Sequence, residues 1–275
     1  FQEDPSRYGL SLTLGGGEMR MTELAQAYSA FPNRGKPRKL QSILKITDAS
    51  GKILYKYQDP NFVENIHEPI EMPNYLAMGG KRVISEEASF LISHILYDNN
   101  ARKDAFGPSS QLNIKGNVPV SVKTGTTDAK KDNWTIGYTP NFMVTVWVGN
   151  NDNTPMNQAL ASGVTGAAPI WNGVMTKVLE GQPILYPVKP EGVVGRRVCK
   201  DGRLEGADGG ACGDTEYEYF KVGTENVRTA RVSTGKVWVN KDTDKQAKQG
   251  DENTEEREKT VMKDMFSDGC LDCAR

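Results

Sequence analysis

VSVKTGTTDAKKDNWTIGYTP, residues 120–140, contains the strongest structural signal in this sequence. Apolar side chains at Val118, Val120 and Val122 alternate with other residues, which predicts a strand. This strand meets Lys123–Thr127, a cluster of one cation, three hydroxyls and one glycine. A glycine in a strand weakens it unless a ligand or another backbone must approach closely. The cluster therefore suggests that a molecule from outside the chain docks at this strand.

Two further strands follow the cluster. WTIGY (134–138) and FMVTVWVG (142–149) are rich in β-branched and aromatic residues and are separated by a Thr-Pro-Asn turn. Their spacing predicts an antiparallel hairpin beside the first strand. Segment 40–57, LQSILKITDASGKILYKY, predicts a second hairpin around Asp48–Gly51.

Three amphipathic segments, 20–31, 84–98 and 168–179, predict helices that pack on the sheet. Thr22 and Ser85 are the expected N-caps of the first two helices. The side chains expected to face inward are Ala88, Leu91, Ile92, Ile95 and Leu96 in the second helix and Ile170, Val174 and Val178 in the third. Trp134, Trp147 and Trp171 are expected in the core, with Trp134 the one that could instead line a site. The fold class is therefore α+β, an antiparallel sheet covered by helices.

The composition changes along the chain and predicts three parts. Residues 1–181 contain the sheet and helices, and residues 182–239 form a Pro/Gly-rich extension. Residues 240–275 are mostly charged or polar and are expected to be disordered or a solvated helix. The sequence thus predicts one core domain followed by an irregular C-terminal extension.

Bulk properties exclude several classes of protein. The net charge of −1 gives no electrostatic reason to expect a nucleic-acid partner. No apolar run approaches the ~18 residues that a membrane-spanning helix needs. With His67 and His94 as the only histidines, a His-based triad or a zinc centre is not expected.

Two other motifs give little support for a phosphate-binding loop or a metal site. LGGGEMRM (14–21) suggests a phosphate loop, but no Gly-Lys-Ser/Thr follows it. Cys270-x-x-Cys273 has no second cysteine pair or nearby histidine, so a disulfide or no bond is favoured over a zinc site. The sequence therefore predicts neither a metal nor a cofactor.

Four segments together resemble one protein family. They are YGLSLTLGGGEMRMTELAQAYSAF (8–31), VISEEASFLISHIL (83–96), VKTGTTDAKKDNWTIGYTPNFMVTVWVGNNDNTPM (122–156) and GVTGAAPIWNGVM (163–175). In this order they resemble the C-terminal part of the transpeptidase domain of class A penicillin-binding proteins, which are bifunctional peptidoglycan synthases. The resemblance covers roughly residues 5–180 and includes the K-T-G element typical of penicillin-binding proteins and β-lactamases.

The resemblance implies a serine D,D-transpeptidase that cross-links peptidoglycan, binds penicillin and needs no cofactor. It implies catalytic roles for Lys123 and Thr126. It implies substrate-binding roles for Thr124, Gly125, Thr126, Thr127 and Trp134. The implied partners are the D-Ala-D-Ala stem peptide of peptidoglycan and β-lactam antibiotics.

Two departures from the family pattern concern the nucleophile. The family places its serine in S-x-x-K and a relay serine in S-x-N, both before the Gly-rich segment. This chain has no S-x-N, and its two S-x-x-K strings, Ser42–Lys45 and Ser233–Lys236, lie after that segment, so we interpret both as chance matches. The chain also begins at Phe1, and we expect it to be a fragment, incomplete at its N-terminus, without the nucleophile half of the domain. A non-catalytic binding or scaffold module, or a related D-Ala-D-Ala carboxypeptidase or β-lactamase, remains as an alternative.

The resemblance also implies a location and a disulfide. The family works in the cell envelope, on the extracytoplasmic face of the bacterial inner membrane, and the parent protein is expected to have a membrane anchor and a glycosyltransferase domain upstream. Thiols are oxidised in that compartment. Cys199 and Cys212, followed by TEYEYF, are similar to the cysteine pair in the family's tail and are the expected disulfide. Such a bridge would stabilise the fold by ~3 kcal/mol on the chain-entropy model.

Overall fold

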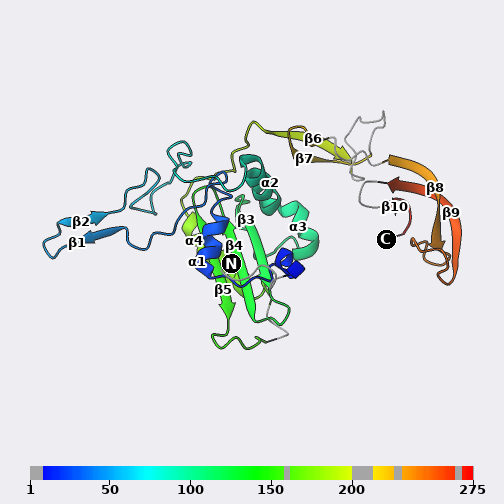
Figure 1. Ribbon diagram of the computed structural model, residues 1–275, viewed down its shortest axis with the longest axis horizontal. Helices are drawn as coiled ribbons and strands as arrows, with labels where there is room; N and C mark the ends of the chain where they lie inside the picture. Colours follow the sequence, from blue (N-terminus) through cyan, green and yellow to red (C-terminus); the bar gives the residue numbers. More distant parts are fainter. Residues whose placement is uncertain (1–8, 158–161, 200–212, 226–230, 264–267, 275) are drawn as a thin grey trace. The chain divides into compact units, whose positions relative to one another are not determined.

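The computed structural model describes residues 9–157, 162–199, 213–225, 231–263 and 268–274 (Figure 1). The chain divides into two units, Phe1–Pro190 and Glu191–Arg275. No helix among these residues is long and apolar enough to cross a membrane.

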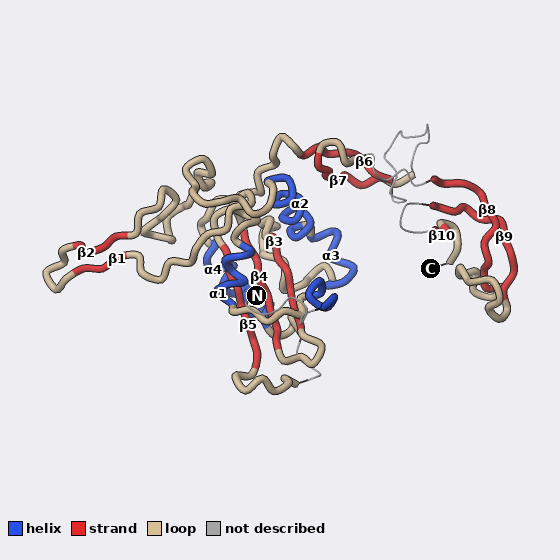
Figure 2. The backbone as a smooth tube through the Cα atoms, viewed as in Figure 1, coloured by secondary structure: helices blue, strands red, loops and turns tan. Residues whose placement is uncertain are grey.

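Unit 1 is built on a three-stranded antiparallel sheet. Strands β3 (Ser121–Thr126), β4 (Asp132–Tyr138) and β5 (Met143–Gly149) pair in the order β3-β4-β5 (Figures 1 and 2). The predicted hairpin is confirmed, but the first strand begins later than expected and includes most of the Lys123–Thr127 cluster. The cluster is therefore part of the sheet rather than a loop after it.

Helix α4 (Ala167–Leu179) covers one face of this sheet, which we call the α4 face. Trp171 is fully buried, and a Cβ atom on Gly137 of β4 would lie 2.3 Å from its ring. The buried core contains Leu112, Ile114, Val120, Val122, Ala168, Trp171 and Met175. Large apolar side chains at this helix–sheet contact stabilise the unit, each by about 1.5–3 kcal/mol.

Helices α1 (Met21–Tyr28) and α2 (Glu86–Tyr97) lie on the opposite face, which we call the α2 face. Tyr138 is 2 % exposed, its hydroxyl lies 3.1 Å from Ser93 Oγ, and burial raises its pKa. The Ser121 hydroxyl donates to the Ser93 carbonyl oxygen at 2.8 Å. These bonds join α2 to β3 and β4 through buried groups that are hydrogen-bonded, as burial requires.

The remaining described elements of unit 1 are not part of this sheet. They are a 3-10 helix (Gly9–Leu14), the hairpin β1 (Lys45–Thr47) and β2 (Ile53–Lys56), and helix α3 (Asn99–Phe106). The hairpin is confirmed, and Asp48 forms its turn by accepting bonds from the backbone of Ser50 and Lys52. Helix α3 was not predicted, because its sequence NNARKDAF has no apolar stripe. Asp98 is its N-cap.

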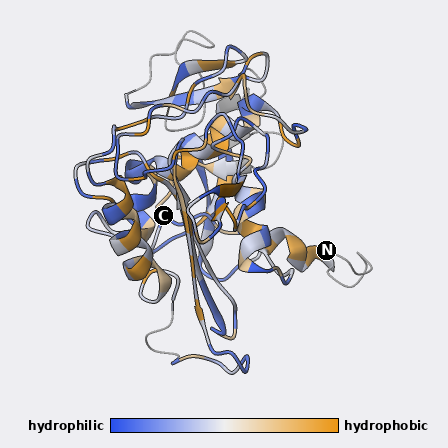
Figure 3. Ribbon diagram, turned by 90° about the vertical axis from the view of Figure 1, so that its left-hand side faces the viewer, coloured by the Kyte–Doolittle hydropathy of each residue, from blue (hydrophilic) through white to orange (hydrophobic). Residues whose placement is uncertain are grey.

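The predicted inward faces of two helices are wrong in part, because only Leu91, Leu96 and Val178 among the predicted residues are half-buried and the others are exposed. In α2 the buried residues are Ser89, Phe90 and Ser93, and in α4 they are Ala167, Ala168, Trp171 and Met175. Ile92, Ile95, Ile170 and Val174 are 38 %, 62 %, 53 % and 44 % exposed. Apolar residues occupy more than one side of each helix, so periodicity did not identify the buried side. Figure 3 shows orange and blue residues interleaved along the helices.

One of the two predicted helix N-caps is confirmed and the other is wrong. Ser85 caps α2 as expected, because its hydroxyl oxygen accepts from Ala88 N at 3.1 Å. The N-cap of α1 is Arg20 rather than Thr22, and Glu23 accepts from the Arg20 backbone N–H at 3.2 Å. Glu23 satisfies one of the backbone donors left free at the start of the helix.

Unit 2 consists of antiparallel strands. β6 (Val193–Cys199) pairs with β7 (Thr215–Lys221), and β9 (Thr254–Lys263) lies between β8 (Arg231–Asn240) and β10 (Asp268–Cys270). The prediction that residues 240–275 are disordered or a solvated helix is therefore wrong for the described part of that segment. β9 has few apolar residues, but cross-strand pairing supplies its backbone bonds, and Val239 of β8 is fully buried.

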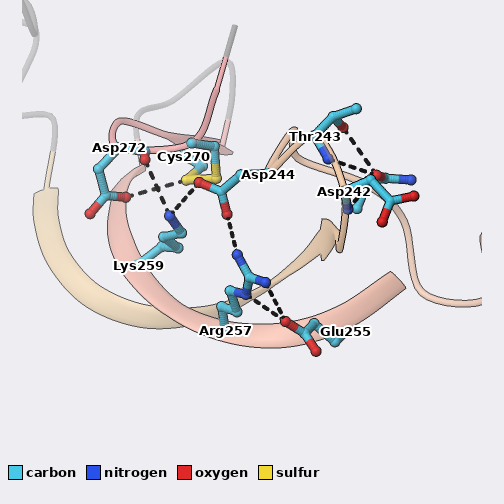
Figure 4. Close-up of polar contacts among 10 residues, drawn as sticks. Asp242, Thr243, Asp244, Glu255, Arg257, Lys259, Cys270 and Asp272 are labelled. Atoms are coloured by element: carbon cyan, nitrogen blue, oxygen red, sulfur yellow. Dashed lines mark hydrogen bonds and ion pairs between the residues drawn. A yellow bond between two sulfur atoms is a disulfide. The ribbon is translucent and has the colours of Figure 1, made fainter. Parts of the chain in front are cut away.

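Ion pairs hold the turn after β8 against β9 (Figure 4). The Asp244 carboxylate accepts from Lys259 Nζ at 2.7 Å and from Arg257 Nη1 at 2.8 Å. Its backbone oxygen accepts from Ala274 N at 3.0 Å. Asp244 thus links β9 with the chain end that follows the Cys270–Cys273 disulfide.

We expect this cluster to make unit 2 sensitive to acid. The hydrogen bond from Lys259, with help from Arg257, lowers the pKa of Asp244. A carboxyl whose pKa is lower in the folded state stabilises the fold above its unfolded pKa and loses that contribution as the pH falls through the folded pKa. Asp244→Asn should therefore lower the unfolding midpoint at neutral pH, and its difference from wild type should shrink between about pH 5 and pH 2.

The matched control is Asp242→Asn, because the bond that the Asp242 carboxylate accepts from the described residues comes from the neutral amide of Asn253. Thermal unfolding of the full chain, followed by circular dichroism across that pH range, measures both variants. A constant difference between Asp244→Asn and wild type at every pH would contradict the assignment.

Candidate active site

Strand β3 is an edge of the sheet. It pairs with β4 on one side, and no strand among the described residues pairs with its other side. Its buried half, Ser121 and Val122, gives way to the more exposed Lys123–Thr126. The polar cluster therefore lies along an accessible strand edge.

The register determines which backbone groups face that open edge. Thr127 N donates to Asp132 O at 3.2 Å, so residues 127 and 132 form a hydrogen-bonded pair. The neighbouring pair, Thr126 and Asn133, is then of the non-hydrogen-bonded kind, whose N–H and C=O groups point away from the partner strand. The Thr126 N–H thus faces outward, where it can donate to a bound molecule.

Lys123 and the two threonines lie on opposite faces of the strand. Lys123 is exposed on the α2 face, and its Nζ donates to the Thr124 carbonyl oxygen at 2.7 Å. Thr124 and Thr126 share the α4 face with their β4 partners Thr135 and Asn133. The strand end therefore has an ammonium group on one face and two hydroxyls on the other.

Gly125 pairs with Trp134 across the sheet. A Cβ atom on Gly125 would lie 3.4 Å from Trp134 Cβ, which is ordinary contact, so the surrounding chain does not by itself require a glycine there. Trp134 is half-buried and packs at 6.4 Å, centroid to centroid, against Trp147. The predicted close approach of a ligand backbone at Gly125 stays a prediction.

Thr127 has a structural part in the β3–β4 turn. Its hydroxyl oxygen accepts from Lys131 N and Asp132 N, both at 3.0 Å. These two bonds hold the turn closed. The predicted substrate-binding role of Thr127 stays a prediction.

Residues from a distant segment also reach the strand end. Gly163 N donates to Thr126 Oγ1 at 2.8 Å, and the buried Thr135 hydroxyl donates to Gly163 O at 3.2 Å. Sequence reasoning missed this contact, because Gly163 is 37 residues from Thr126 and glycine there carries no local signal.

Neither S-x-x-K string starts a helix. Ser42 lies in an exposed loop just before β1, which contains Lys45, and Ser233 and Lys236 both lie within β8. Ser233 and Lys236 lie three positions apart in one strand, so their side chains point to opposite faces, whereas Ser42 lies in a loop and shares no helix with Lys45. These geometries do not support either serine as a nucleophile.

The cysteines do not form a metal site among the described residues. Ligand atoms of Cys270, Asp272 and Cys273 lie within 4.8 Å of one another, but the two sulfurs form a disulfide. Cys199 is disulfide-bonded, whereas Cys212, its expected partner, lies outside the described residues. The Cys199–Cys212 pairing stays a prediction.

The chain is similar in sequence to penicillin-binding proteins. The family model "Penicillin binding protein transpeptidase domain" matches residues 8–176. Penicillin-binding protein 2D of Bacillus subtilis is 29% identical over 220 residues, covering 78% of this chain and 28% of that protein. Penicillin-binding protein 1A of Vibrio cholerae is 25% identical over 240 residues, covering 78% and 29%.

The crystal structure of penicillin-binding protein 1A from Haemophilus influenzae is similar, with a TM-score of 0.58 and 25% identity. The similarity covers 80% of this chain and 34% of that one. The chain spans less than a third of the length of the two curated relatives above. The α+β fold prediction is confirmed, and the chain belongs to the penicillin-binding protein transpeptidase domain family.

Proposed function

We propose that the open edge of β3 is the substrate-binding half of a serine D,D-transpeptidase active site. The observation that carries this proposal is the placement of Lys123, Thr124 and Thr126 on a strand edge with which no other described strand pairs, with the Thr126 N–H pointing outward. Membership of the transpeptidase family supports it. Substrate, reaction and location are proposed for a longer protein that contains these residues.

In this proposal the donor stem peptide, ending in D-Ala-D-Ala, lies along β3 as an added strand. The hydroxyl groups of Thr124 and Thr126 donate hydrogen bonds to its terminal carboxylate, and Lys123 supplies positive charge. The Thr126 N–H donates to the oxyanion that forms when the penultimate carbonyl carbon is attacked. Trp134 lies beside Gly125 in the sheet and contacts the peptide, whose backbone approaches Gly125 closely.

The attacking serine belongs to a segment outside these 275 residues. Its oxygen forms a bond to the D-Ala carbonyl carbon, and terminal D-Ala leaves with the proton that a lysine has taken from the serine. The resulting ester is then attacked by an amine of a neighbouring stem, which forms the cross-link and regenerates the serine. This chemistry uses no histidine, metal or cofactor.

The remaining features of the family are proposed with it. β-Lactams acylate the same serine, and their carboxylate occupies the place of the terminal D-Ala carboxylate. The protein works at the extracytoplasmic face of the bacterial inner membrane, and its upstream part contains a glycosyltransferase domain and a membrane anchor.

One observation favours a second candidate, a non-catalytic binding module. Both S-x-x-K serines among the described residues lie outside helices, so the described chain offers no activated serine at β3. Sequencing the DNA upstream of Phe1 separates the candidates. An open reading frame that continues into S-x-x-K and S-x-N supports the enzyme, whereas a start codon at or near Phe1 supports the binding module.

We expect the 275-residue chain alone to form no covalent adduct with a fluorescent penicillin. Oxyanion donors without a nucleophile cannot form an acyl bond. The measurement is gel fluorescence after denaturation, with the full-length protein as the positive control. A denaturation-resistant adduct that peptide mapping assigns to Ser42 or Ser233 would overturn the assignment of the nucleophile to another segment.

A further inference from the structure

The turn Ser162–Gly166 leads into α4 and packs on the β3 end of the sheet. Its backbone is closed by the bond from Gly166 N to Ser162 O at 2.8 Å. Gly163 O accepts from Ala168 N at 3.0 Å, which ties the turn to the first turn of α4. The turn is therefore a fixed part of the helix start rather than an independent loop.

Gly163 joins this turn to the sheet through both its N–H and its carbonyl oxygen. Its N–H donates to the hydroxyl oxygen of Thr126 at 2.8 Å, and its carbonyl oxygen accepts from the fully buried Thr135 hydroxyl at 3.2 Å. Thr135 donates from β4, next to β3, and so fixes the height of Gly163 above the sheet. The N–H of Gly163 is thereby held against Thr126 from the α4 face.

Only glycine fits at residue 163 in this position. A Cβ atom there would lie 2.9 Å from Thr124 Cβ and 3.1 Å from Gly125 O. Both are closer than ordinary carbon contacts, and the second neighbour is backbone that cannot rotate away. A larger residue would push the turn off the strand and lengthen the bond to Thr126.

The bond from Gly163 determines what the Thr126 hydroxyl can do next. A hydroxyl has one proton and two acceptor lone pairs. When Gly163 N–H occupies one lone pair, the oxygen is held in place and the proton remains available for donation in another direction. The Thr126 side chain is exposed, so an incoming carboxylate can accept that proton.

We propose that Gly163 is a positioning residue that sets the Thr126 hydroxyl as a donor to the substrate carboxylate. This inference rests on the proposed function, because it assumes that a carboxylate binds at Thr126. A purely structural role would have Gly163 hold β3 and α4 together, with no preference for an anionic ligand. The two roles differ in their dependence on the ligand's charge.

The experiment measures acylation of the full-length protein by benzylpenicillin and by its uncharged methyl ester. The second-order acylation rate constants are compared for wild type, Gly163→Ala and the control Gly173→Ala. Residue 173 lies within α4, and a Cβ atom there would meet no atom within 4 Å. Both variants thus add one methyl group to a glycine of the same region.

We expect Gly163→Ala to slow acylation by benzylpenicillin roughly 10- to 100-fold, the size of one hydrogen bond to a charged group. Acylation by the ester should fall less than about 3-fold, and Gly173→Ala should change neither rate. In a Thr126→Val background, Gly163→Ala should have little further effect, since the hydroxyl it positions is gone.

A second variant tests the same role without adding a side chain that could misfold the protein. Thr135→Val keeps the shape of the side chain but removes the donor to Gly163 O, so it should lower the benzylpenicillin rate selectively without adding bulk. Equal losses with acid and ester, or no loss in either variant, would overturn the positioning role. A wild type that is not acylated, or that reacts equally with acid and ester, would instead contradict the proposed function.

Discussion

Lys123→Ala is expected to reduce acylation of the full-length protein by benzylpenicillin about 10²- to 10³-fold. A preorganised charged donor aimed at the reacting centre stabilises the transition state by about 2.7–4 kcal/mol. The Lys123 side chain is exposed at the strand edge, and its Nζ is held by the Thr124 carbonyl oxygen at 2.7 Å. Its removal should change the free energy of unfolding by no more than about 0.5 kcal/mol.

The measurement pairs acylation kinetics with urea denaturation of the same samples. Lys115→Ala, an exposed lysine before β3, is the control for loss of one positive charge. Lys123→Arg keeps the charge but changes its geometry, so it should retain part of the activity if charge alone matters. Near-normal acylation of Lys123→Ala would show that the ammonium group has no part in the reaction.

Trp171→Ala is expected to destabilise unit 1 by about 3–5 kcal/mol, the cost of removing a large aromatic side chain from a packed core. Trp171 is 0 % exposed and its ring packs over Gly137 of β4. Because domains are stable by only about 5–15 kcal/mol, this substitution should remove a large share of the stability of unit 1. The midpoint of urea unfolding is the measurement.

Ile170→Ala is the matched control, since Ile170 is the preceding residue and is 53 % exposed. It should change the free energy of unfolding by less than about 0.5 kcal/mol. The pair tests which side of α4 faces the sheet, because the apolar periodicity favoured Ile170, whereas the structure exposes Ile170 and buries Trp171, which was expected in the core as an aromatic residue. Equal effects of the two substitutions would contradict that placement.

Local features of this protein followed from the sequence alone. The turn at Asp48, the Ser85 cap and the hairpin of β4 and β5 depend on residues within a few positions of one another, so short-range chemistry determines them. The K-T-G strand was recognised for the same reason: its residue types and their order carry the signal.

The tertiary structure decided the features that depend on distant partners. The burial of Phe90 and the exposure of Ile170 depend on which helix side the sheet covers, and each helix has apolar residues on more than one side. Strand β9 exists because β8 pairs with it along its length, although its own sequence is almost all polar. The Gly163–Thr126 bond joins residues 37 positions apart, and only the packing of α4 on the sheet brings that backbone donor to the strand end. Each of these contacts forms only once the chain has folded, because its energy comes from a partner that local sequence does not specify.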